Sequence, residues 1–190
     1  MLIDLASSLI AYVAITLAFG EAASAGNLAI GVVAALSPDC DYAIYACVRN
    51  KFAVISHRFV HYPLAWLTGA LAFGYLSGDW YRASLAAAGF AIHFVHDSYG
   101  WVGIQWLWPF MPKAYISFGR GGRGFQIMTP ETRRSILHYR YGHELRQGFW
   151  DVFWGRLRDE FTNLGFTVEI YLILSFTVVC VFFLLYPPAS

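Results

Sequence analysis

Residues 166–186, FTVEIYLILSFTVVCVFFLLY, form the longest apolar stretch of the chain and contain one charge, Glu169. An α-helix rises about 1.5 Å per residue, so a stretch of this length can cross a hydrocarbon core about 30 Å thick. Four shorter apolar segments precede it, at residues 5–19, 22–36, 60–76 and 83–100. The sequence therefore predicts an all-α fold, a polytopic membrane helix bundle with about five transmembrane helices.

The composition supports a membrane protein. Of the 190 residues, 58% are hydrophobic, 18% aromatic and 13% charged, and the mean hydropathy is +0.50. Soluble domains carry about 25% charged residues, so an ordinary soluble domain, a disordered chain and a collagen are excluded. The three cysteines, Cys40, Cys47 and Cys180, are odd in number and lack zinc-finger spacing, which predicts unpaired thiols rather than a disulfide scaffold.

The basic residues predict an orientation. Three Lys or Arg lie between the second and third apolar segments and nine between the fourth and fifth, against Arg82 alone on the other side. Cytoplasmic loops hold the excess of Lys and Arg, so the amino terminus is predicted inside and the carboxyl terminus outside. Asp4 stands where a signal peptide has basic residues, which indicates that the first segment is retained.

The hydrophobic pattern divides the chain into three parts: a four-span membrane domain at 1–110, a basic cytoplasmic segment at 111–165 and a C-terminal transmembrane helix at 166–190. Thr129-Pro130-Glu131 resembles a helix start, with a capping hydroxyl, proline in the first turn and an acid. Further on, apolar residues recur at helical spacing among Arg146, Arg156 and Arg158; they are Leu145, Phe149, Val152, Phe153 and Leu157. This pattern predicts an amphipathic helix that lies on the membrane surface or packs on the rest of the protein.

Ionisable residues at the ends of the apolar segments are candidates for function, because such groups are costly near a bilayer. They form three clusters, all predicted at the cytoplasmic level, and consist of Asp39 and Asp41, His57 and His61, and His93, His96 and Asp97. On helices, the i, i+4 pairs His57/His61 and His93/Asp97 each share one face. The two aspartates follow Pro38, which favours a turn over a continuing helix.

Imidazole and carboxylate together are typical ligands of zinc, manganese or iron. We therefore expect one or two divalent ions, zinc first, held by Asp39, Asp41, His57, His61, His93 and Asp97. His96 is the candidate for proton transfer, and Arg58, Arg120 and Arg123 are candidates for phosphate contact. The alternative is that these histidines only anchor the chain at the interface, and that the basic residues only bind anionic lipid.

Three motifs carry a resemblance to a known family. They are Pro38-Asp39-Cys40-Asp41, His57-Arg58-Phe59-Val60-His61 and His93-Phe94-Val95-His96-Asp97, followed by Gly103 and Trp108-Pro109-Phe110. Their order and spacing resemble the YdjM-type proteins of the bacterial inner membrane, which implies a multi-pass, metal-dependent hydrolase. The spacing of His93 and Asp97 is also distantly similar to zinc-dependent phospholipase C and single-strand nucleases.

Together these features predict hydrolysis of a phosphoester of a lipid or lipid-linked substrate at the cytoplasmic face. Membrane lipids are the expected partners, and nucleic acid is not expected because topology accounts for the basic residues. Phe59, Val60 and Tyr62 depart from the family pattern. These departures favour the alternative, a non-catalytic structural or assembly subunit of a membrane complex. An ion pathway and a haem-binding subunit fit the ligand set less well.

Overall fold

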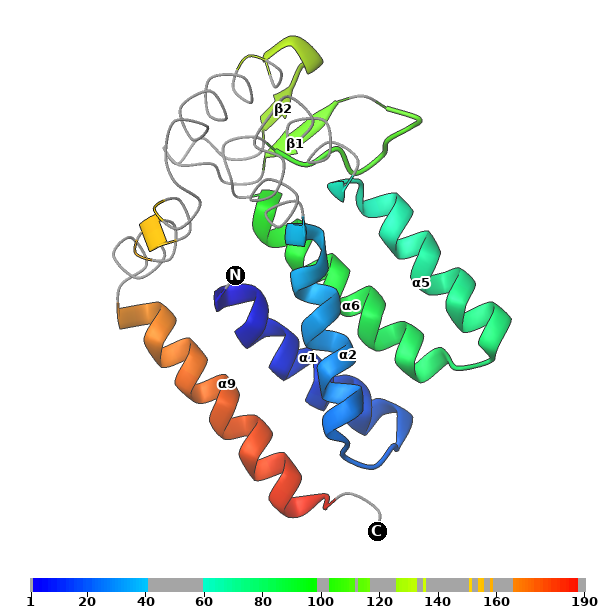
Figure 1. Cartoon of the computed structure of the whole chain (residues 1–190), viewed down its shortest axis with the longest axis vertical. Coiled ribbons are helices and arrows are strands. Elements are labelled where there is room, and N and C mark those ends of the chain that lie inside the picture. Colours follow the sequence, from blue (N-terminus) through cyan, green and yellow to red (C-terminus); the bar gives the residue numbers. More distant parts are fainter. Residues whose placement is uncertain are drawn as a thin grey trace. The chain divides into compact units, whose positions relative to one another are not determined.

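The computed structural model describes residues 2–40, 60–98, 103–111, 113–116, 126–132, 135, 151, 154–155, 158 and 166–187. Most of these residues are helical, as the all-α prediction expects. The helices and strands are α1 (Leu2–Phe19), α2 (Ala25–Leu36), the 3-10 helix η1 (Ser37–Cys40), α5 (Pro63–Ser77), α6 (Trp80–Ser98), β1 (Ala114–Ile116), β2 (Gln126–Met128) and α9 (Phe166–Leu185) (Figure 1).

Helix α1 is long and apolar enough to cross a membrane, and within the described residues it alone meets both conditions. Ala25–Cys40 and Ile170–Leu185 form shorter apolar helices. The five-span topology and the orientation of the amino terminus therefore stay predictions.

Local capping explains where two helices begin. Helix α2 starts at Ala25, three residues later than predicted, because the Ser24 hydroxyl accepts a hydrogen bond from the Asn27 N–H at 3.4 Å. Helix α6 starts at Trp80, three residues earlier than predicted, because Asp79 Oδ1 accepts the Arg82 N–H at 2.9 Å. Hydropathy averaged over a segment does not contain this information, since a cap is a single polar residue at or near its edge.

Residue contacts divide the chain into two compact units. The first comprises Met1–Ser37, Trp66–His93 and Leu157–Ser190, and the second comprises Pro38–Ala65 and Phe94–Arg156. In the first unit, α1 packs against α2 and against α9 (Figure 1). The core of this unit is formed by Tyr12, Ala23, Tyr81, Leu85 and Phe182.

Buried polar residues recur every four positions along α1. Asp4, Ser8, Tyr12 and Thr16 are each at most 2% exposed. The Tyr12 hydroxyl donates to the carbonyl of Ser24 at 3.1 Å and accepts its N–H at 2.8 Å, and the Thr16 and Tyr81 hydroxyls are 2.8 Å apart. Because polar groups in an apolar bundle need partners, these bonds fix how α1 is rotated against its neighbours.

We expect Tyr81→Phe to lower the free energy of unfolding by about 1 to 3 kcal/mol, because the buried Thr16 hydroxyl loses its partner. Tyr75→Phe is the matched control, since Tyr75 is 79% exposed. Equilibrium unfolding in detergent measures both variants. Equal free energies of unfolding for the two variants would show that the Thr16–Tyr81 hydrogen bond contributes nothing to stability.

Helices α2 and α6 approach closely through small residues. A Cβ atom added at Gly89 of α6 would lie 2.6 Å from the Gly31 carbonyl oxygen and 2.8 Å from the Ala35 nitrogen, both on α2. Such distances are shorter than van der Waals contact, so only glycine fits at this position. Close backbone approach through small residues is typical of helices that pack inside membranes.

The second unit contains two short strands that the sequence analysis did not predict. β1 and β2 pair antiparallel, with Ala114 opposite Met128, and Ile104 forms an isolated bridge to Tyr115. Gly103 has a φ of 63°, and a side chain there would meet Ile116 at 2.9 Å. Glycine therefore allows both the positive φ and the close approach of the backbone at this position to β1.

The predicted helix start at Thr129 is confirmed. The Thr129 hydroxyl accepts the Thr132 N–H at 3.3 Å, and residues 130–132 are helical. The apolar positions of the predicted amphipathic helix lie outside the described residues.

Candidate metal centre

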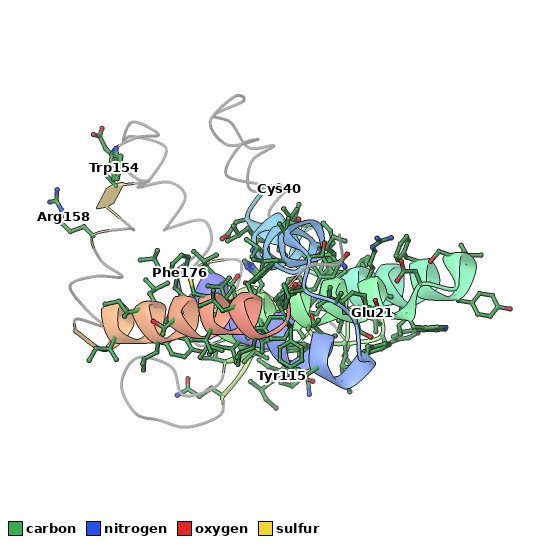
Figure 2. All side chains as sticks on the ribbon, turned by 90° about the horizontal axis from the view of Figure 1, so that it is seen from below. Glu21, Cys40, Tyr115, Trp154, Arg158 and Phe176 are labelled. Atoms are coloured by element: carbon green, nitrogen blue, oxygen red, sulfur yellow. The ribbon has the colours of Figure 1, made fainter. Side chains whose placement is uncertain are left out.

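Asp39 is held by the turn that ends α2. α2 stops at Leu36, and Ser37–Cys40 continues as the 3-10 helix η1, with Pro38 buried. This agrees with the predicted turn after the second apolar segment. Cys40 is exposed and lies at the end of η1, as Figure 2 shows. Asp39 is only partly exposed and so lies in a different environment from Cys40.

His61 lies just before helix α5 rather than within it. α5 begins at Pro63, which suits the first helical position because it lacks an N–H, and proline disfavours a helical conformation in the residue before it. His61 is 1% exposed, and its ring forms a T-shaped pair with the Phe94 ring, with centroids 6.3 Å apart. The expected extension of this helix back to residue 60 is therefore wrong, because proline sets the boundary.

His93, His96 and Asp97 lie in the last turns of α6, where the predicted i, i+4 spacing of His93 and Asp97 holds. His93 is fully buried, whereas His96 and Asp97 are partly exposed. One ligand atom each of Asp39, His61 and His93 lies within 4.8 Å of the others. Three segments separated in sequence thus supply a group that can hold a metal ion.

A carboxylate lies beside each histidine of this group. Asp97 Oδ2 is 3.2 Å from His61 Nε2, and Asp4 Oδ2 is 3.8 Å from His93 Nδ1. The Asp97 side chain is 33% exposed and the Asp4 side chain 1%. Histidines that bind metals commonly donate their second ring N–H to a carboxylate, which fixes the tautomer and the ring orientation.

Asp4 is the residue that the sequence analysis missed as part of this site. From the sequence, Asp4 indicates only that the first segment is not a signal peptide. The signal was present, because an acid in the first turn of an apolar helix is an ionisable group where such groups are costly. Its partner could not be identified from the sequence, since 89 positions separate it from His93.

Five of the predicted site residues lie outside the described residues. They are Asp41, His57, Arg58, Arg120 and Arg123. Their roles as ligands or phosphate contacts stay predictions.

The comparison with protein families bears on the same residues. The family model described as YdjM inner membrane protein matches residues 3–186, nearly the whole chain. The chain belongs to this family. The resemblance carried by the three motifs is thereby confirmed, and the match begins early enough to include Asp4 of this YdjM protein. No curated protein and no solved structure matches the chain.

Proposed function

We propose that this YdjM protein is a membrane-embedded, metal-dependent hydrolase. Its substrate is a phosphoester of a lipid or lipid-linked molecule at the cytoplasmic face. The observation that carries the proposal is the group formed by Asp39, His61 and His93, whose ligand atoms lie within 4.8 Å of one another.

The donor set fits a catalytic zinc ion. Two imidazoles and one carboxylate leave one position of a tetrahedral ion open, which distinguishes catalytic from structural zinc sites. Ligand bonds of about 2.0 to 2.1 Å place two donors of one tetrahedral ion about 3.3 Å apart, so small side-chain rotations suffice. Asp41, His57 and the Oδ1 atom of Asp97, whose Oδ2 atom faces His61, are the proposed ligands of a second ion. Manganese or iron are alternatives to zinc.

The residues of the chain have distinct roles in this mechanism. Asp39, His61 and His93 would hold a divalent ion, which would supply Lewis-acid chemistry toward water and a phosphoryl oxygen. Asp97 accepts from His61 Nε2 and holds that ring in place. His96, three residues after His93 on α6, moves a proton, and Arg58, Arg120 and Arg123 contact the phosphate.

Elemental analysis of the protein purified in detergent tests this function. We expect about one to two equivalents of zinc, manganese or iron, and loss of the metal in Asp39→Ala/His61→Ala. Glu21→Ala is the control, because Glu21 is an exposed acid in the turn after α1 (Figure 2). A screen with phosphoester substrates then compares the same three proteins.

A wild-type protein without metal would contradict the hydrolase and favour the second candidate, a non-catalytic subunit of a membrane complex. One observation supports that candidate independently. Tyr62, which stands where the family pattern has serine, is buried and stacks on Trp108 with ring centroids 3.9 Å apart. This residue has a packing contact where a small hydroxyl could have supported the ligands.

A further inference from the structure

The environment of Asp4 distinguishes it from an ordinary acid at a helix start. The helix dipole favours a carboxylate in the first turn of α1. This explains why an acid stands at this position, but it does not explain why the acid is buried. Its side chain is 1% exposed, and so is that of His93. Burial of two ionisable groups in an apolar bundle is costly unless they interact.

We propose that Asp4 is a positioning residue for His93, a role that rests on the proposed metal centre. The carboxylate of Asp4 accepts the Nδ1–H of His93, and the ring then presents Nε2 to a divalent cation. Asp4 lies on α1, whereas Asp39, His61 and His93 all come after α2 in the chain. The proposal therefore adds a residue of the first helix to the metal centre.

The distance between the two groups suits this role. Asp4 Oδ2 and His93 Nδ1 are 3.8 Å apart. An N–H···O hydrogen bond needs about 3.0 Å, so a relative shift of about 0.8 Å closes the pair. Neutral imidazole carries a single N–H, and a carboxylate beside Nδ1 selects the tautomer that has its proton there.

His61, the other histidine of the group, also lies beside a carboxylate, but the carboxylate is next to the other ring nitrogen. Asp97 lies beside Nε2 of His61, whereas Asp4 lies beside Nδ1 of His93. Because water reaches Asp97 and is kept from Asp4, the contact of Asp4 is less screened. In this arrangement Asp97 fixes the ring of His61 and Asp4 fixes the ring of His93. Asp4 is the more buried of the two carboxylates.

Ser8 is a buried polar residue on the same face of α1 whose hydrogen bond is made within its own helix. Ser8 lies one turn after Asp4 on α1 and is 2% exposed. Its hydroxyl donates to the Leu5 carbonyl at 2.8 Å, a bond within its own helix. Ser8→Ala is thus a matched control that removes a buried polar group from the same helix face.

Zinc affinity tests the role of Asp4. Competition against a chelator, with the detergent-purified protein and zinc alone, gives the dissociation constant for wild type, Asp4→Asn and Ser8→Ala. We expect about 10-fold to 100-fold weaker binding in Asp4→Asn, the range typical for lost partners of metal ligands, and no change in Ser8→Ala.

A second measurement needs no variant of Asp4 and so is independent of its folding. Nitrogen-15 NMR of zinc-loaded wild type with labelled histidine, assigned by comparison with His93→Gln, reports the tautomer of His93. We expect coordination through Nε2 and a protonated Nδ1.

The outcomes separate the two proposals. If wild type binds zinc but Asp4→Asn binds it as tightly as Ser8→Ala does, or if His93 coordinates through Nδ1, the role of Asp4 is overturned and the metal centre stands. If wild type binds no zinc, the metal centre is overturned, and the role of Asp4 with it.

Discussion

Zinc at a hundredfold excess over its dissociation constant should stabilise the wild-type protein by about 2.7 kcal/mol, and His61→Ala should abolish this increase. A ligand that binds only the folded state adds RT ln(1 + [L]/Kd) to the free energy of unfolding. His61 is central to the group because it combines 1% exposure with proximity to Asp39 and His93. Equilibrium unfolding in detergent, with and without zinc, measures the difference.

The control for this experiment is Glu21→Ala, which removes an exposed acid in the turn after α1 that does not belong to the group. This variant should keep the full stabilisation by zinc. If His61→Ala keeps it as well, zinc binds elsewhere on the protein and the proposed centre is wrong.

The second large effect concerns packing. Gly89→Ala should lower the free energy of unfolding by about 1 to 3 kcal/mol or more, because the added methyl group meets the backbone of α2 at 2.6 Å. Backbone atoms cannot rotate away as a side chain can, so the two helices must separate.

Gly69→Ala is the matched control for this substitution. Gly69 lies in α5, and an added Cβ meets nothing within 4 Å. Alanine there should be neutral or stabilising by about 0.4 to 1 kcal/mol, because it reduces the freedom of the unfolded chain. Comparable destabilisation of both variants would show that helix propensity or the detergent, and not the α2–α6 contact, dominates.

The sequence could predict the helices because apolar runs of suitable length are a local signal. It placed the boundaries less well. α5 begins at Pro63, inside the predicted segment 60–76, and α6 begins at Trp80, before the predicted segment 83–100. Each boundary depends on a single residue, Pro63 and Asp79, whose effect on the backbone the hydropathy does not contain. The strands β1 and β2 are three residues each, too short for a periodic pattern.

For the candidate site, the sequence predicts which residues take part better than it predicts how they pair. Asp39, His61 and His93 could be selected from residue type and predicted topology, because each lies at the end of an apolar segment. The pairing of His61 with Asp97 and of His93 with Asp4 depends on side-chain direction. That direction is set by tertiary packing, so the sequence alone predicted His93 and Asp97 as partners and did not find Asp4.

The packing of α1 against α9 has a consequence for biosynthesis. The Ser7 hydroxyl lies 3.2 Å from that of Tyr171, 164 positions further along the chain. At about 5 to 20 residues per second, translation takes roughly 10 to 30 s to cover that distance. During this interval α1 exists without α9. The polar side chains of α1 that face α9 therefore lack this partner until Tyr171 has been synthesised, and the α1–α9 contact forms late.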